Sequence, residues 1–139
     1  MSRKSYVKTV NSNSTAVLAN SVVPIGTTFV SGYNRSNIER VGNSIIIHDR
    51  CVNGYKITAN VTFTAPVAGV VTLLMQQNGS NIIGATASTT ITTATTEVRN
   101  LSFSTIIKST GGCADDVISL LTGALAITTS NVEFDVEAL

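Results

Sequence analysis

Few side chains in this sequence could perform chemistry. His48 is the only histidine, and it follows the run Ile45-Ile46-Ile47 with Asp49 beside it. Nucleophilic catalysis would pair such a histidine with a carboxylate and a nucleophile. Neighbouring residues in a β-strand point to opposite faces, so His48 and Asp49 would not touch. The pattern therefore predicts a histidine at a strand end that makes one hydrogen bond and has no catalytic role.

Acidic residues are the next candidates. Asp115 and Asp116 are adjacent, while Glu133, Asp135 and Glu137 alternate and would share one face of a strand, where they could hold a hard cation. A solvated acidic face explains the same pattern without a metal. A glycosidase-like acid pair would need aromatic rings around its sugar, yet aromatic residues are only 5% of the chain and tryptophan is absent. We expect no enzyme activity, no cofactor and no metal.

The two cysteines, Cys51 and Cys113, are too few for a disulfide framework and too far apart in sequence for a metal knuckle. Both lie at the ends of expected strands, so they could meet at one end of a β-sandwich. Two outcomes stay open, a disulfide between them or two separate thiols.

The composition limits the partners of this 139-residue chain. Charged residues make up 12%, about half the usual share, and the net charge of +1 gives no field that would attract nucleic acid or an anionic membrane. No apolar run is long enough to span a bilayer. The length fits one domain. We expect neither nucleic acid nor a membrane as a partner.

The N-terminal segment holds the only basic cluster, formed by Arg3, Lys4 and Lys8. Residues 1–13 are polar and lack a strong period, so we expect them to be an arm outside a domain at 14–139. The arm could attach the chain to an acidic partner surface, or it could only aid solubility.

The elements that would position these residues are β-strands. The run Tyr55 to Thr64 alternates apolar and polar residues without a break, which places two opposite faces on one strand. Asn78-Gly79 is a strong hairpin signal. About nine strands are expected in total, with turn signals between them, and they lie at 16–23, around 29–30, and at 44–48, 55–64, 70–76, 82–93, 97–107, 117–128 and 131–138.

Three of these strands do not alternate. Residues 45–47, 70–75 and 117–121 are apolar on both expected faces. The outer face of a small sandwich should be polar, so these strands need a cover. A chain of this size has little mass to spare for one, and we expect the cover to be another copy of the chain.

The same residues resemble a known family. Residues 54–63, with Gly54-Tyr55 opening the strand, are similar to the core strand of tumour-necrosis-factor-like and complement-globular-head-like jelly rolls. The turn at 65–69, the hairpin at 76–84 and the paired segments 121–127 and 133–136 extend the resemblance, which covers roughly 40–139.

This resemblance implies an all-β fold, an antiparallel two-sheet jelly-roll sandwich. It also implies a homotrimer with hydrophobic strands around the threefold axis, whose interface candidates are Ile45, Ile47, Leu74, Val117 and Leu121. Proteins of this kind in spore-surface filaments and in complement carry a collagen-like Gly-x-y stalk, and this sequence has no such repeat.

Among such proteins it looks most like a phage virion protein, a capsid decoration or head-fibre protein. It would be made in the host cytoplasm, docked through its arm to the major capsid protein and displayed on the virion surface. The alternative is a receptor-binding module that recognises a host-surface glycan or protein through loops 31–43 and 108–116.

Overall fold

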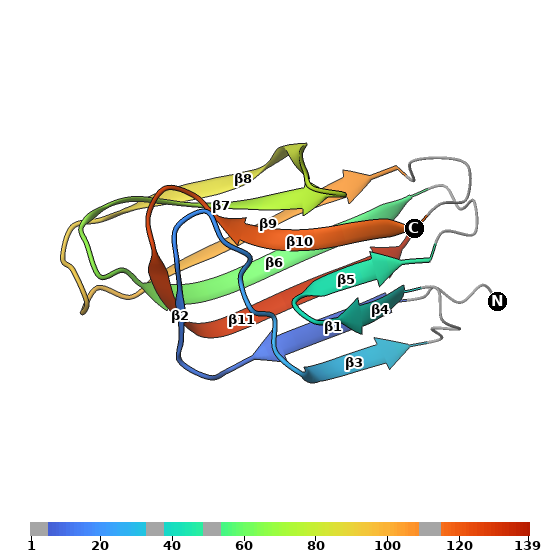
Figure 1. Cartoon of the computed structure of the whole chain (residues 1–139), viewed down its shortest axis with the longest axis horizontal. Helices are drawn as coiled ribbons and strands as arrows, with labels where there is room; N and C mark the ends of the chain where they lie inside the picture. The colour runs from blue at the N-terminus through green and yellow to red at the C-terminus, as the bar shows by residue number, and fades with distance from the viewer. Residues whose placement is uncertain (1–5, 33–37, 49–53, 109–114) are drawn as a thin grey trace.

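The computed structural model describes residues 6–32, 38–48, 54–108 and 115–139. Every regular element in these ranges is a strand, and no helix there could span a membrane. Figure 1 shows the strands as two layers. In chain order they are β1 (Tyr6–Asn11), β2 (Thr15–Val17), β3 (Thr28–Gly32), β4 (Ile38–Val41), β5 (Ser44–Ile47), β6 (Tyr55–Thr64), β7 (Gly69–Gln77), β8 (Ser80–Ile91), β9 (Arg99–Ile107), β10 (Asp116–Thr122) and β11 (Ile127–Ala138).

The strands form two antiparallel sheets. One sheet has the order β3-β1-β11-β6-β9, with β2 also paired to β11, and the other has the order β4-β5-β10-β7-β8. Most neighbours within each sheet are far apart in the chain, because successive segments cross from one sheet to the other. The expected two-sheet jelly-roll sandwich is confirmed.

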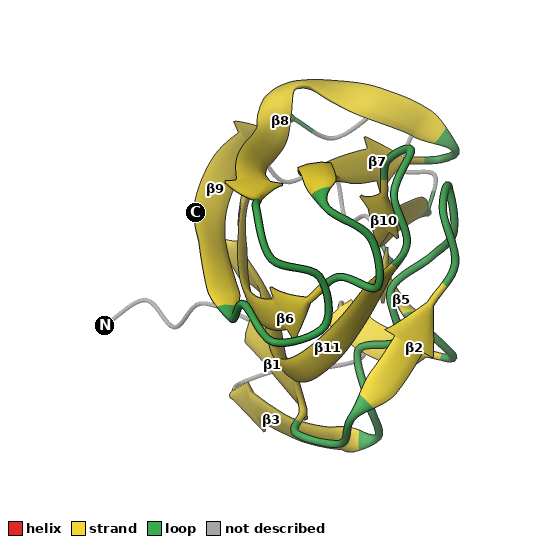
Figure 2. Cartoon of the chain, turned by 90° about the vertical axis from the view of Figure 1, so that its left-hand side faces the viewer, coloured by secondary structure: helices red, strands yellow, loops and turns green. Residues whose placement is uncertain are grey.

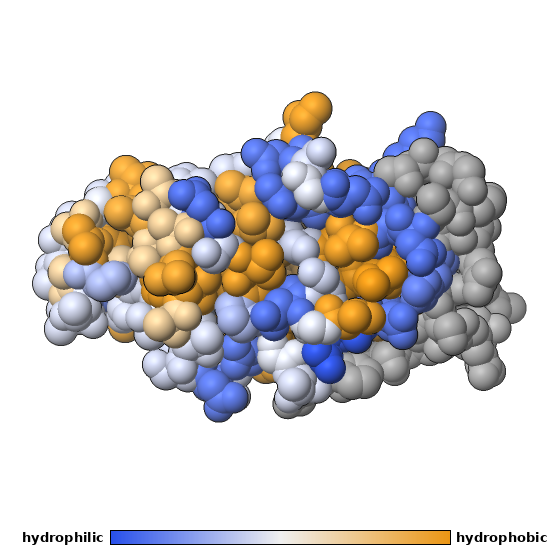
Figure 3. Space-filling view, viewed as in Figure 1, coloured by the Kyte–Doolittle hydropathy of each residue, from blue (hydrophilic) through white to orange (hydrophobic). Residues whose placement is uncertain are grey.

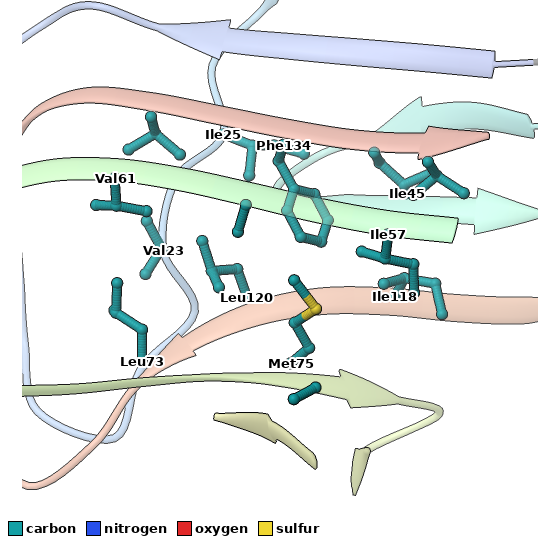
Figure 4. Close-up of a cluster of buried hydrophobic side chains, with 14 of the residues drawn as sticks. Val23, Ile25, Ile45, Ile57, Val61, Leu73, Met75, Ile118, Leu120 and Phe134 are labelled. Carbon is teal, nitrogen blue, oxygen red and sulfur yellow. The ribbon is translucent and has the colours of Figure 1, made fainter. Parts of the chain in front are cut away.

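The hydrophobic core lies between the sheets. Figure 4 shows Ile57 and Phe134 from one sheet facing Met75 and Leu120 from the other. All four side chains are completely buried. Each strand contributes every second residue to this layer, so the alternation in the sequence is also the pattern of burial.

Two sequence predictions are confirmed in detail. The alternating run at 55–64 is β6, and its apolar residues from Tyr55 to Phe63 are at most 2% exposed. Asn78 and Gly79 both have positive φ angles, 55° and 83°, and join β7 to β8 as a two-residue hairpin turn. Such turns require positive φ at both central residues, which Asn and Gly tolerate.

The prediction of a free N-terminal arm is wrong from Tyr6 onward. Residues 6–11 form β1, which pairs with β11 on one side and β3 on the other. Its inward face includes Thr9 and Asn11, whose side chains donate hydrogen bonds to the carbonyls of Phe134 and Pro24 at 3.1 Å. Because this inward face is partly polar, the strand carries no clear apolar period in the sequence.

The expected strands at 16–23 and 117–128 are also divided differently. After β2 the chain crosses to the second sheet, where the Thr122 hydroxyl donates to the Leu18 carbonyl at 2.6 Å. The Gly123 nitrogen then donates to the Thr72 carbonyl at 2.8 Å. A Cβ on Gly123 would lie 3.0 Å from the Thr72 Cβ, so this close crossing ends β10 and separates it from β11.

The strand β4 was also not predicted from the sequence, and it lies inside the expected loop 31–43. Its four residues form a hairpin with β5 through Gly42-Asn43. A strand of this length is too short to show a period. With β1 and β4 added, the described residues contain eleven strands where about nine were expected.

We expect Leu120→Ala to lower the free energy of unfolding by about 2–5 kcal/mol, because it leaves a cavity where the two sheets meet. The matched control is Leu18→Ala, which removes the same atoms from a side chain that is 75% exposed and should change stability by no more than about 0.5 kcal/mol. Urea denaturation at one protein concentration measures both. Equal effects would contradict the placement of Leu120 in the core.

Candidate functional site

The outer face of the β4-β5-β10-β7-β8 sheet carries apolar side chains. We call Ile46, Leu74, Val117 and Leu121 the outer apolar face. Val117 is 37% exposed and the other three are half-buried. Figure 3 shows orange patches on this side of the molecule, with paler and blue residues between them. The prediction of strands that are apolar on both faces is therefore confirmed for β5, β7 and β10.

A polar row divides the outer apolar face. Leu121 lies opposite Leu74 on one side of it, and Val117 lies opposite Ile46 on the other. Between the two pairs, the hydroxyls of Ser44 and Ser119 are 2.8 Å apart. This row places hydrogen-bonding groups between two apolar pairs, which suits a contact surface better than an isolated hydrophobic patch would.

Two of the five interface candidates are wrong. Ile45 and Ile47 are completely buried within the single chain, because they face the core while Ile46 faces outward. They cannot contact another subunit without opening the sandwich. Leu74, Val117 and Leu121 reach the outer surface and stay candidates.

A second apolar surface lies where β8 and β9 meet. Each is the last strand of its sheet, and Figure 2 shows them next to each other on one side of the sandwich. We call this side the open edge. Leu101 and Phe103 of β9 face inward but are only half-buried, although their partners Val61 and Ala59 are completely buried. The core is therefore incompletely covered along this edge.

The open edge also carries exposed side chains and a groove. Ile83 is 96% exposed and Ile106 is 65% exposed. Both line a groove of about 410 Å³ between the β7–β8 hairpin and the end of β9. This surface was not predicted from the sequence, because no local pattern indicates that β8 and β9 are edge strands on the same side.

The outer face of the other sheet is polar. Asn100 donates to Asn60 Oδ1 at 2.7 Å and Ser102 donates to the same oxygen at 3.0 Å. The expected acidic face is present here, since Glu133, Asp135 and Glu137 all point outward from β11. Within the described residues, no three histidine, cysteine, aspartate or glutamate side chains are grouped so as to hold a metal ion.

Asp135 is the acid with the most unusual surroundings. Burial raises the pKa of Asp135 above its ordinary value of 3.8, the positive charge of Lys8 opposes this, and Glu133 and Glu137 add to it. Its buried Oδ1 atom has no hydrogen-bond partner among the described residues. Lys8 lies 3.5 Å from Glu133, so part of its charge is already neutralised. The ionised Asp135 carboxylate is therefore poorly compensated.

His48 makes more contacts than the sequence predicted. Its Nε2 atom lies 2.7 Å from Glu39 Oε1, and its Nδ1 atom lies 3.2 Å from Asp115 Oδ2. The prediction of one hydrogen bond is wrong, because β4 and the residue before β10 bring two carboxylates from distant parts of the sequence to the same ring. Neither contact includes a hydroxyl or thiol nucleophile.

Several predictions fall outside the described residues. These are the basic residues Arg3 and Lys4, the cysteines Cys51 and Cys113 with their possible disulfide, and residues 33–37 and 109–114 of the two proposed receptor loops. The third basic residue, Lys8, belongs to β1 and forms its ion pair within the sheet. Lys8 could therefore contribute to attachment only through the part of its charge that is exposed to solvent and not neutralised by Glu133.

Comparison with known proteins shows the fold. No protein-family model matches the sequence, and no curated protein matches it. Among solved structures, Eiger TNF from S. frugiperda is similar with a TM-score of 0.65 and 8% identity, over 98% of this chain and 91% of that chain. Murine APRIL at pH 5.0 has a TM-score of 0.63 and 12% identity, over 99% of this chain and 100% of that chain.

The globular domain of zebrafish complement 1qA has a TM-score of 0.64 and 10% identity, over 99% of this chain and 97% of that chain. The chain therefore has the jelly-roll fold shared by tumour-necrosis-factor-like and complement-globular-head-like proteins. At these identities the likeness extends to the fold and no further, because one fold can carry many functions.

We expect Asp135→Asn to stabilise the chain at neutral pH. A raised pKa in the folded state means that the folded chain holds the proton more tightly than the unfolded chain does. The wild type therefore loses stability as the pH rises from below 3.8 through the folded-state pKa, and the variant avoids this loss. Urea denaturation should show a higher free energy of unfolding for the variant than for the wild type at neutral pH, and no difference at acidic pH.

Glu137→Gln is the matched control for this prediction, because it neutralises a neighbouring exposed acid that only adds to the shift. The free energy of unfolding of Glu137→Gln at neutral pH should rise less than that of Asp135→Asn. An Asp135→Asn variant that is less stable than the wild type at neutral pH would show that the carboxylate is held by favourable charge contacts.

Proposed function

We propose that this chain is a non-enzymatic structural protein that assembles as a homotrimer. The observation that carries the proposal is the open edge, where Leu101 and Phe103 face the core but stay half-exposed. Covering apolar surface is favourable by about 25 cal/mol per Å². All the described strands are already part of the two sheets, so none of them is left to cover this edge. We propose that another copy of the chain covers it.

A closed ring of identical subunits joins two different patches, one from each neighbour. The open edge supplies the first patch. We propose the outer apolar face as the second, because Leu74, Val117 and Leu121 leave apolar area on β7 and β10, whose outward-facing side chains are all uncharged. The number three follows from the family resemblance of residues 54–63 and the segments after them.

The prediction is that the wild-type chain sediments at about three times its mass of 14.5 kDa at micromolar concentration. Ile106→Lys at the open edge and Val117→Lys on the outer apolar face should each release monomers, because each places a charge in a buried contact. Val67→Lys is the matched control, since Val67 is a 59% exposed turn residue outside both patches and should leave the trimer intact. Circular dichroism checks that each variant folds.

Each part of this proposal has its own contradicting result. A monomeric wild type would refute the assembly. A trimeric Ile106→Lys variant would remove the open edge from the interface, and a trimeric Val117→Lys variant would remove the outer apolar face.

We further propose that the trimer belongs to the surface of a phage particle, as a capsid decoration or head-fibre protein. The support is the composition, with 12% charged residues and outward positions rich in Thr, Ser and Asn, together with the basic residues Arg3 and Lys4 next to β1. A neutral polar surface of this kind suits a protein that packs densely among others. Capsid and portal genes beside its own gene would support this placement, and a different gene neighbourhood would argue against it.

The attachment role can be tested on purified particles. Because β1 belongs to the sheet, the deletion must stop before it and remove only residues 1–5. We expect the shortened chain to stay trimeric but to bind particles at least tenfold more weakly, since a basic segment loses its charge attraction to an acidic surface. Undiminished binding would refute an attachment role for Arg3 and Lys4.

A further inference from the structure

His48 lies between two other strands of its sheet. It directly follows β5, with β4 on one side and the start of β10 on the other. Glu39 comes from β4 and Asp115 precedes β10, so the three side chains connect three adjacent strands on the outer face. The His48 side chain is 28% exposed, so the ring is partly shielded from water while protons can still reach it.

The two contacts use opposite nitrogens of the ring. Nε2 faces Glu39 at 2.7 Å and Nδ1 faces Asp115 at 3.2 Å. An ionised carboxylate can only accept hydrogen bonds, and a neutral imidazole carries only one N–H. Both contacts can therefore be satisfied together only by the protonated ring, which has two N–H donors. The opposite directions also prevent the two carboxylates and one ring nitrogen from converging on a metal ion.

We propose that His48 is a proton-operated clamp that ties the edge strand β4 to the start of β10. When the ring is protonated, it donates to Glu39 and Asp115 at once. When it loses a proton, one ring nitrogen has a lone pair that faces a carboxylate oxygen, and that contact opens. The strand β4 is then held by its backbone pairing with β5 and its buried Ile38, without the clamp.

The charges around the ring favour the protonated state. Glu39 and Asp115 are the two described charged groups that contact it, one from each neighbouring strand. The hydrogen bond that the ring donates to Glu39 raises the pKa of His48 above its ordinary value of 6.5, burial opposes this, and Asp115 raises it further. The stability contributed by the clamp is thus complete below pH 6.5 and is lost as the pH rises through the raised folded-state pKa.

Nuclear magnetic resonance can follow the clamp directly, because His48 is the only histidine and its imidazole Cε1–H gives one signal. We expect this signal to titrate above pH 6.5 in the wild type. Glu39→Gln and Asp115→Asn should each lower the midpoint, and the double variant should lower it most. The control Glu137→Gln removes the same charge from the opposite sheet and should leave the midpoint unchanged.

Hydrogen exchange tests the mechanical part of the inference. After correction for the pH dependence of intrinsic exchange, protection of the β4 amides should fall as His48 deprotonates, while protection in β6 should stay constant. In His48→Phe the β4 amides should be less protected and no longer respond to pH over this range. The second variant His48→Gln checks that the result does not depend on the size of the ring.

A His48 midpoint at or below 6.5, or one that neither carboxylate variant lowers, would overturn the charge contacts. A raised midpoint with β4 protection that ignores pH would overturn the clamp. The clamp lies on the same sheet face as Ile46 and Val117, so both measurements are repeated on the Ile106→Lys variant, where the same result separates this inference from the assembly proposed above.

Discussion

The pairing of β6 with β11 determines how the rest of this molecule is built. The two strands lie side by side along almost their whole length and send Ile57 and Phe134 into the space between the sheets. Since side chains alternate with a period of two, burying these residues fixes which positions of both strands face outward. The outer polar network around Asn60 and the acids of β11 follow directly from that choice.

A chain of this size covers its core only in part. Burial is complete where β10 and β7 face β6 and β11, but it weakens towards β8 and β9, which end the two sheets on the same side. Unpaired strand edges with apolar side chains are a risk for uncontrolled association unless a defined partner covers them. The proposed trimer places a defined partner at Ile83 and Ile106. The function would then depend on the shape of the fold and on its incompletely covered core, and not on a catalytic group.

The sequence predicted those features that depend on local patterns. The alternation in Tyr55–Thr64 and the Asn78-Gly79 turn are decided by neighbouring residues, so the pattern alone located them correctly. β1 was missed because its inward side includes Thr9, which a hydrogen bond to the Phe134 carbonyl makes acceptable in the core. That bond joins residues at opposite ends of the chain, and no local signal could indicate it.

By itself, the sequence determined the fold class and the presence of strands with two apolar faces. It could not decide which face of such a strand points inward. In the run Ile45-Ile46-Ile47 all three side chains are alike, and only the pairing of β5 with β10 turns the middle one outward. The same pairing brings Asp115 to His48, from 67 residues away in the chain. Composition and period are local properties, whereas burial and charge contacts depend on which distant strands become neighbours, and only the tertiary structure decides that.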